Sequence, residues 1–211
     1  MKNYTILVLI VLMALNACKK ESDNTTSKAI ADEPASSELV TTEPTLDDFR
    51  VGEKWVWLEK SVAEGKIRWE GKELKEVVAF KGSLGFWYGK DTVLISNTLN
   101  QEQSSTPYWS WPLKVGKKWK YESEWKNAEG TPMTTSMDVE VVSYGEEAVL
   151  AGRFAAYKIE YKGTITNAIG GAADIHETYW YAPELKVNIK KVQDDGYGSY
   201  VLELYDYKKG E

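Results

Sequence analysis

Alternation of aromatic and charged side chains is the feature that most constrains how this chain can fold. From Trp119 to Trp125 the aromatic residues share one set of alternate positions, and charged residues occupy the other. The same period of two recurs in Ile175–Tyr181 and Tyr200–Tyr205. Because successive side chains of a β-strand point to opposite faces of a sheet, the pattern predicts strands with one apolar face. The best helix candidate is a single short turn in Leu74–Phe80.

Turn-forming residues divide residues 47–211 into segments of strand length. Asp-Gly and related pairs favour the tight turns of β-hairpins. We expect hairpin turns at Ala63–Gly65, Ala128–Gly130, Ser143–Gly145, Ala151–Gly152 and Asp194–Gly196. Segment 97–106 is expected to be a polar loop, and segment 163–173 a glycine-rich loop or wide hairpin end. The predicted fold class is a single all-β domain over residues 47–211. It would be a strongly bent antiparallel sheet of about nine to twelve short strands, arranged as a sandwich or a half-barrel.

The N-terminal segment has the charge and hydropathy of a secretory signal. Lys2 precedes an apolar run, Ile6–Leu15, which is shorter than the roughly 20 residues that span a bilayer. The residues Leu15-Asn16-Ala17-Cys18 resemble the lipobox of bacterial lipoproteins. The resemblance implies that residues 1–17 are removed as a signal peptide and that Cys18, the only cysteine, carries the lipid anchor. The alternative is an ordinary signal peptide beside an unrelated cysteine.

Residues 18–46 have the composition of a flexible tether that begins at the lipidated cysteine. From Lys19 onwards the stretch is rich in Ser, Thr, Asp, Glu and Pro and has no aromatic residue, so it buries too little apolar surface to fold. By resemblance to Gram-negative sorting signals, Lys19 rather than Asp after Cys18 favours the outer membrane. We therefore expect a protein of the bacterial cell envelope, lipid-anchored at the outer membrane, on its periplasmic side or at the cell surface.

Charge and composition exclude several classes of partner and chemistry. The formal net charge is −6, and removal of residues 1–17 takes away one lysine and no acid, which gives −7. Such an acidic protein is not expected to bind nucleic acid, because the phosphates repel it. With Cys18 lipidated no thiol remains, and His176 is the single histidine. No metal site, no cofactor and no set of catalytic residues is predicted.

Nine tryptophans and thirteen tyrosines make the chain rich in aromatic side chains. Most occupy alternating strand positions, where they are expected to fill the core. Two clusters, 86–88 and 108–111, place aromatic residues at consecutive or facing positions, so part of each is expected to point away from the core. The candidate ligand-binding residues are Trp87, Tyr88, Tyr108, Trp109 and Trp111. The alternative is that both faces of a bent sheet are buried and absorb every aromatic residue.

Two segments of the chain are similar to one another. Residues 51–57 and 115–121 both begin with the pattern Val-Gly-x-Lys-Trp. One interpretation is a duplicated half of the domain. The simpler interpretation, which we favour, is that two strands begin in the same way, with glycine in the entry turn and tryptophan in the core.

Residues 110–207 carry three motifs in a definite order. They are Pro112-Leu113-x-Val115-Gly116-Lys117-x-Trp119, Ala151-Gly152-x-Phe154-x-Ala156-Tyr157-x-Ile159, and Glu177-x-Tyr179-Trp180-Tyr181-Ala182-Pro183-Glu184-Leu185-x-Val187. This order resembles bacterial exported and lipoprotein families known mainly as domains of unknown function. The resemblance implies a large, strongly bent antiparallel sheet and supplies no catalytic residues. The chain departs from the pattern at Leu185-Lys186, where glycine is expected.

Three functions from different classes fit these observations. The first, which we favour, is a non-catalytic binding or interaction module that holds a glycan, a lipid or an envelope protein on an aromatic sheet surface. The second is a carrier that encloses a lipid or another apolar ligand in a half-barrel cavity. The third is a hydrolase of envelope polymers, for which the sequence offers no motif.

Overall fold

The computed structural model describes residues 41–99, 104–195 and 198–211. In these residues ten antiparallel strands form one open sheet, with two short helices, η1 (Leu46–Asp48) and α1 (Ile95–Leu99). This confirms the predicted all-β fold class, as a single bent sheet rather than a sandwich. The strands are β1 (Lys54–Ala63), β2 (Lys66–Phe80), β3 (Ser83–Trp87), β4 (Thr92–Leu94), β5 (Lys118–Lys126), β6 (Pro132–Val149), β7 (Gly152–Asn167), β8 (Ala172–Ala182), β9 (Val187–Asp194) and β10 (Ser199–Lys208). The predicted signal peptide, Cys18 and residues 18–40 of the predicted tether lie outside the described residues.

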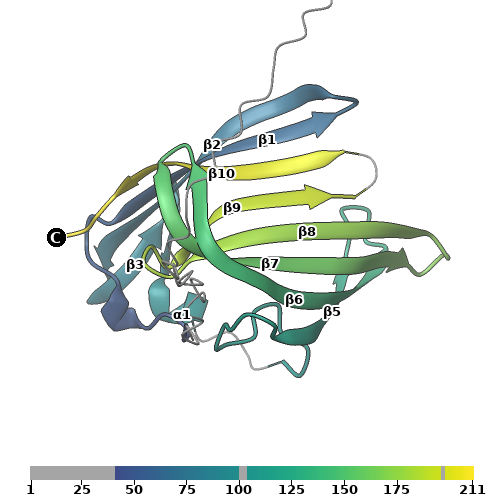
Figure 1. Ribbon diagram of the computed structural model, residues 1–211, viewed down its shortest axis with the longest axis horizontal. Coiled ribbons are helices and arrows are strands. Elements are labelled where there is room, and N and C mark those ends of the chain that lie inside the picture. Colours follow the sequence, from purple (N-terminus) through teal and green to yellow (C-terminus); the bar gives the residue numbers. More distant parts are fainter. Residues whose placement is uncertain (1–40, 100–103, 196–197) are drawn as a thin grey trace, which may run out of the picture. The chain divides into compact units, whose positions relative to one another are not determined.

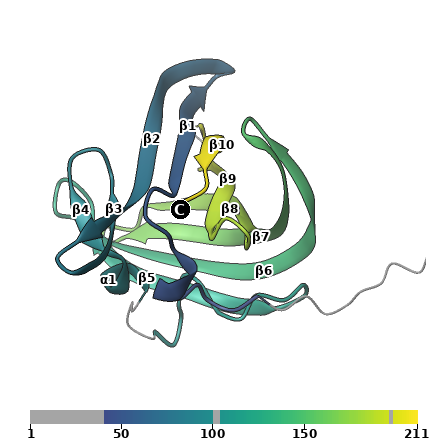
Figure 2. The same ribbon diagram turned by 90° about the vertical axis from the view of Figure 1, so that its left-hand side faces the viewer.

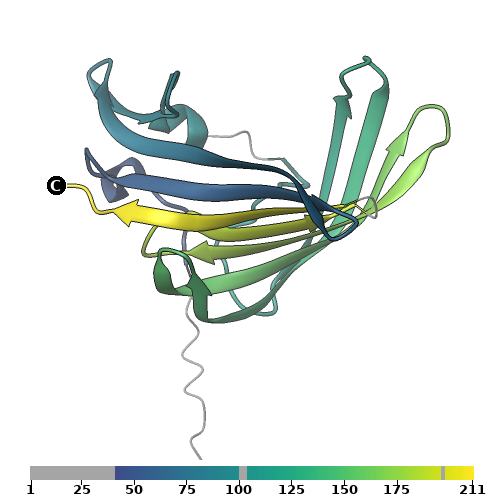
Figure 3. The ribbon, with the colours of Figure 1, turned by 90° about the horizontal axis from the view of Figure 1, so that it is seen from above.

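Two meanders make up the sheet. Strands β1–β4 and β5–β10 each pair with their neighbours in sequence, and β1 pairs with β10, which gives the order β4-β3-β2-β1-β10-β9-β8-β7-β6-β5 (Figure 1). Residues 95–117 connect the meanders and contain α1 and a segment that we call the strap, residues 104–117. Seen from above, the hairpin ends of β5–β6 and β7–β8 diverge from that of β1–β2 (Figure 3). In the middle of the sheet, the pairing of β1 with β10 brings together parts of the chain that are distant in sequence.

Several strands are longer than the short strands that the sequence predicts. Strands β2, β6 and β7 have 15, 18 and 16 residues. The prediction of a turn at Ser143–Gly145 is wrong, because β6 continues through these residues. The strand pairs with β7 on both sides of a register shift between Val141 and Ser143. A β-bulge of this kind bends a strand without ending it. The helical turn considered for Leu74–Phe80 is also absent, since these residues form the last part of β2.

Other expected turns are confirmed. Ala63–Gly65, Ala128–Gly130 and Ala151–Gly152 lie at the turns of the β1–β2, β5–β6 and β6–β7 hairpins. Segment 163–173 contains a hairpin end, and β7 continues to Asn167 while β8 starts at Ala172, so the loop itself is short. Parts of the expected turn Asp194–Gly196 and of the expected loop 97–106 lie outside the described residues.

The long β6–β7 hairpin accounts for much of the bend in the sheet. Its tip curls back over the neighbouring strands towards β10 (Figures 1 and 2). At the tip, the Ala151 N–H donates to the Leu204 carbonyl at 2.9 Å, and the Leu150 N–H donates to the Glu203 carboxylate at 3.1 Å. Because β8 and β9 lie between β7 and β10 in the sheet, these bonds require strong curvature there.

Cross-strand partners define the two faces of the sheet, because residues directly opposite each other point to the same side. One row of such partners crosses the sheet from β2 to β5. It consists of Trp69, Ser61, Tyr200, Gln193, Glu177, Tyr161, Val139 and Trp119. We call the side to which this row points the aromatic face. The other side carries Lys120, Asp138 and Lys162, among other charged residues, and we call it the charged face.

Two hydrophobic clusters cover parts of the aromatic face. In the first, Phe49 beside η1 packs edge-on against Trp55 and Phe86, with ring centroids 6.5 and 5.2 Å away, and Ile95 of α1 is buried with them. In the second, the strap packs on β7 and β8. Between the two clusters, a row on strands β2, β1, β10 and β9 borders a hollow in the surface. We call this row the open strip, and its residues are Trp69, Ser61, Tyr200 and Gln193.

The similar segments 51–57 and 115–121 begin β1 and β5 with the same turn. Gly52 and Gly116 have φ values of 81° and 85°, a region that glycine adopts without strain. The N–H of each donates at 2.8 Å to the neighbouring strand, to the carbonyls of Val77 and Val141. Beyond this entry the two strands differ in position, since β1 lies inside the sheet and β5 at its edge.

Candidate functional site

The structure places the predicted ligand-binding residues of the strap against the sheet. The Trp109 and Trp111 rings stack with centroids 6.0 Å apart and planes 19° from parallel. Both rings also lie against Tyr181, at 5.8 and 5.3 Å, and Trp109 lies 5.8 Å from Tyr179. The two tryptophans are therefore partly buried and act as a cover for β7 and β8.

The other predicted residues lie elsewhere. Trp87 and Tyr88 are at the end of β3, and β2, β1, β10 and β9 separate β3 from β8 in the sheet. Tyr88 is 40% exposed and has its ring edge-on to Phe86 at 6.4 Å. The five aromatic residues chosen from the sequence therefore occupy two separate places and do not form one surface.

A buried carboxylate lies beneath the strap. The Tyr108 hydroxyl donates to Glu177 Oε2 at 2.6 Å and lies 2.5 Å from the Tyr179 hydroxyl, while Lys191 Nζ lies 3.0 Å from Glu177 Oε1. Burial, followed by the nearby Tyr179 and Glu177, holds the pKa of Tyr108 far above its usual range, so its hydroxyl remains a donor. This network attaches the strap to β8 and β9.

Sequence reasoning passed over Glu177 and Lys191, although a signal for Glu177 exists. Glu177 occupies the same alternate positions as Ile175 and Tyr179, which are buried. An acid on the apolar side of a strand requires partners when it is buried. Lys191 carries no comparable signal, because its approach to Glu177 depends on the pairing of β8 with β9.

The open strip combines an exposed aromatic ring with polar side chains. It runs across four strands from Trp69 through Ser61 and Tyr200 to Gln193. The adjoining hollow has a volume of about 600 Å³. It is lined by Ser61, Ala63, Lys191, Gln193, Asp195, Gly198, Ser199 and Tyr200. A hollow with this lining suits a polar ligand better than a hydrocarbon chain.

The Trp69 ring covers a glycine, Gly71. A Cβ added to Gly71 would lie 2.6 Å from Trp69 Cζ2 and 2.9 Å from Cη2, so the indole occupies the space in which a side chain would stand. Trp69 is nevertheless 50% exposed. The six-membered ring of the indole therefore covers the backbone of β2 at Gly71, and half of the Trp69 surface remains exposed to solvent.

Hydrogen-bonding groups beside this ring are available to a ligand. Within the described residues, the side chains of Ser61, Gln193 and Tyr200 and the indole N–H of Trp69 have no hydrogen-bond partner. Lys191 is held at the strip by Glu177, and its Nζ lies 5.8 Å from the Tyr200 ring centroid. The four residues of the open strip thus offer donors and acceptors and carry no charge of their own.

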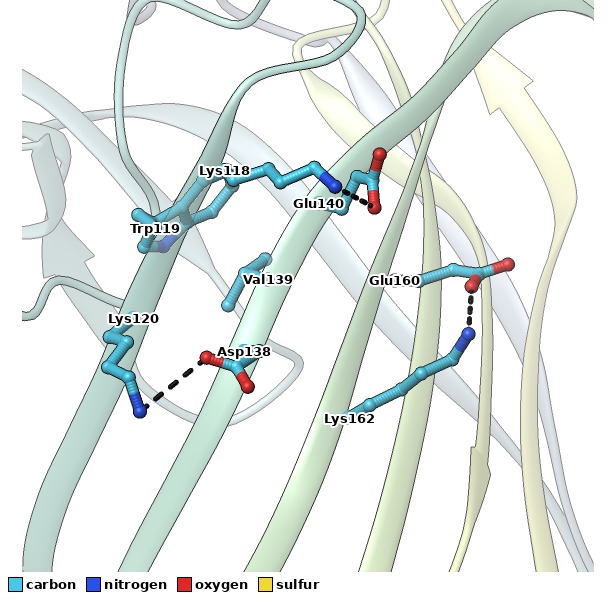
Figure 4. Close-up of a pocket in the computed structure, with 8 residues that line it drawn as sticks. All are labelled: Lys118, Trp119, Lys120, Asp138, Val139, Glu140, Glu160 and Lys162. Carbon is cyan, nitrogen blue, oxygen red and sulfur yellow. Dashed lines mark ion pairs between the residues drawn. The ribbon is translucent and has the colours of Figure 1, made fainter.

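A second hollow, of about 490 Å³, lies on the charged face across β5, β6 and β7 (Figure 4). Its charges are already paired, in Lys118–Glu140 at 3.1 Å, Lys120–Asp138 at 3.5 Å and Lys162–Glu160 at 2.6 Å. Hydrogen bonds from the lysines on either side of Glu160, Lys158 and Lys162, lower its pKa to about 2. Exposed pairs of this kind contribute little individually and leave little charge for a ligand, so this hollow is the weaker candidate.

Among the residues that the structure describes, no group of three or more His, Cys, Asp or Glu side chains could hold a metal ion. His176 lies on the charged face, opposite Lys162 and Asp194. Within the same residues, no helix has the length and hydropathy needed to cross a membrane.

Comparison with known proteins yields structural likenesses at low identity. The sequence matches no family model and no curated protein sequence. A crystal structure from Parabacteroides distasonis, provisionally described as a lipoprotein, is 12% identical with a TM-score of 0.45 over 80% of this chain and 99% of that chain. Another, from Bacteroides fragilis and provisionally described as an exported protein with a YmcC-like fold, is 12% identical with a TM-score of 0.37 over 81% of this chain and 100% of that chain. At these values neither likeness carries an argument about what this chain does.

Proposed function

We propose that this chain is a non-catalytic binding module of the bacterial cell envelope, tethered through a lipid on Cys18, and that its ligand-binding surface is the open strip. The observation that carries the proposal is the half-exposed indole of Trp69, which covers Gly71 beside side chains without hydrogen-bond partners. Large apolar groups that remain exposed beside organised polar groups are typical of interaction sites. The lipid anchor and an outer-membrane location rest on the sequence around Cys18 and Lys19.

Two features make this proposal stronger than that of a lipid carrier. A carrier needs a largely enclosed apolar cavity. On the aromatic face, the volume beside β7 and β8 is filled by Trp109 and Trp111, and that beside β3 by Phe49 and Ile95. The two hollows described above are lined mainly by polar and charged side chains.

The proposal of a hydrolase is weaker for a different reason. Hydrolysis of a glycosidic bond needs two carboxyl groups that face the bond from opposite sides. Glu177, the buried carboxylate beneath the strap, is already bound by Tyr108 and Lys191. This arrangement neutralises Glu177 and leaves it a positioning role for the strap and for Lys191.

The test of the proposed surface is a matched pair of tryptophan variants of the full chain. Trp69 and Trp125 are 50% and 43% exposed, but the Trp125 indole N–H donates to the Thr135 hydroxyl at 3.0 Å. We expect Trp69→Ala to weaken binding of envelope components and Trp125→Ala to leave it unchanged, with the unfolding temperature of Trp69→Ala close to that of the parent. Equal binding by both variants and the parent would remove the open strip from consideration.

A further inference from the structure

We infer that the ligand of the open strip is a chain of uncharged sugars, whose rings stack on Trp69 and whose hydroxyl groups bond to the polar side chains beside it. The inference rests on the proposed function and specifies the class of ligand. Four observations carry it: the position of the indole over Gly71, the unpaired polar groups, the balance of charge and the length of the strip.

The position and exposure of Trp69 suit a flat ring with an apolar face. The indole extends along β2 over Gly71, where it occupies the space of a side chain, and half of the Trp69 surface is open to a ligand. A sugar ring has one side of carbon-bound hydrogens, which can lie on an aromatic face, and a rim of hydroxyl groups. The absence of a side chain at Gly71 is therefore what allows β2 to offer such a surface.

The neighbouring groups suit the hydroxyl rim. The hydroxyls of Ser61 and Tyr200 can both donate and accept, and the amide of Gln193 supplies two donors and an acceptor. Glu59, which pairs directly with Gly71, adds a carboxylate beside the indole, and burial followed by the nearby Glu73 raises its pKa. A ligand rich in hydroxyl groups can satisfy all of these groups, and a hydrocarbon chain can satisfy none.

The charges around the strip favour an uncharged ligand. Lys191 is neutralised by Glu177 at 3.0 Å, so the strip has no free cation to attract a phosphate or a uronic acid. Glu59 and Glu73 on the adjoining positions of β1 and β2 repel anions. These two acids make anionic lipid headgroups and acidic polysaccharides the less suitable ligands.

The length of the strip favours several sugars over one. Trp69 and Gln193 are separated by three strand-to-strand steps, which correspond to about 14 Å. This distance exceeds the width of one sugar ring, so an oligosaccharide that lies across the strands can contact both ends. A monosaccharide would reach only the indole or only the polar end.

The experiment is calorimetric titration of the full chain, in detergent, with neutral hexasaccharides of glucose, mannose and N-acetylglucosamine and with an acidic hexamer of galacturonic acid. We expect at least one neutral hexasaccharide to bind and the acidic one not to bind. Trp69→Ala should weaken that binding about tenfold, which corresponds to the loss of one ring contact. Gly71→Ala should weaken it as well, although Trp69 is retained, because the new Cβ displaces the indole.

The outcomes separate the ligand class from the function. Trp125→Ala is the control and should bind as the parent does. Binding of vesicles or of an envelope protein that depends on Trp69, without binding of any neutral hexasaccharide, would overturn the sugar ligand and leave the binding module in place. Absence of any binding that depends on Trp69 would overturn both. If Gly71→Ala loses the cooperative unfolding of the parent, the comparison of Trp69→Ala with Trp125→Ala still decides the matter.

Discussion

Lys75 on β2 lies among aromatic side chains, and its burial there disfavours the charged form of its amine. Its Nζ lies 4.5 Å from the ring centroid of Phe86, 4.9 Å from that of Trp55 and 5.7 Å from that of Trp57. Attraction to the ring faces offsets part of the cost of burial. Burial nevertheless lowers the Lys75 pKa from 10.5 to about 8, in spite of the nearby Glu73 and Glu53. The Glu53 carboxylate is already bound by Lys186, at 2.7 Å, which limits its help.

The cost of this charge follows from the pKa. A lowering from 10.5 to about 8 corresponds to about 3 kcal/mol when Lys75 is protonated, at 1.36 kcal/mol per pH unit. Contact with solvent reduces this to about 1–2 kcal/mol, because the side chain is only partly buried. We therefore expect Lys75→Met to raise the free energy of unfolding at pH 7 by about 1–2 kcal/mol.

The sign of the pH dependence makes the test specific. Between pH 8 and pH 10.5 the unfolded chain keeps the Lys75 proton and the folded chain has lost it, so the parent gains stability as the pH rises. Lys75→Met lacks this gain, and its advantage over the parent should disappear by about pH 10.5. Urea unfolding of both proteins at pH 7 and pH 10.5 measures this difference, and ionisation of the tyrosines cancels between them. A difference that does not change with pH, or a destabilised variant at pH 7, would refute the reasoning.

Three further predictions test the fold, the strap and the anchor. Gly163→Ala should lower the free energy of unfolding by about 3 kcal/mol or more, because the new Cβ would overlap the Ser136 carbonyl of β6. Gly145 has open space around the position of a Cβ, so Gly145→Ala should change the free energy of unfolding by less than about 1 kcal/mol. Urea unfolding of the two variants compares them, and equal stabilities would contradict the pairing of β6 with β7. Trp109→Ala should cost about 2–3 kcal/mol in the same assay, since its ring packs between the strap and β8, and unchanged stability would make it a free surface residue. Cys18→Ala should abolish labelling with radioactive palmitate and release the protein from the membrane fraction, whereas persistent labelling would locate the lipid elsewhere.

The aromatic residues illustrate why the candidate site could be predicted only in part. The sequence indicated that clusters 86–88 and 108–111 contain more aromatic residues than one strand face can bury. The structure packs Trp109 and Trp111 onto Tyr181 of β8, a contact between segments about 70 residues apart. Trp69, which no local cluster marks, is half exposed on the aromatic face. Burial of an aromatic ring depends on what packs against it, and its immediate sequence neighbours do not determine this.

The ends of strands show a similar division. The turns at Ala63–Gly65 and Ala128–Gly130 follow from residues that adopt positive φ, which is a local property. The absence of a turn at Ser143–Gly145 follows from continued pairing of β6 with β7, which a reading of β6 alone does not reveal. Turn-forming residues therefore indicate where a chain can reverse, and pairing with a neighbour decides whether it does.

The sequence by itself determined the class of fold and which side chains of a strand point to the same face of the sheet. Alternation places Trp119, Tyr121, Ile175 and Tyr179 on one side of their strands, and only a sheet buries such a pattern. The tertiary structure alone decided that β1 pairs with β10, that the strap covers β7 and β8, and that Trp69, Ser61, Tyr200 and Gln193 become neighbours. The physical reason is the range of the interactions. Side-chain direction along a strand repeats every two residues, whereas neighbours across strands depend on register and topology, which the packing of the whole chain selects.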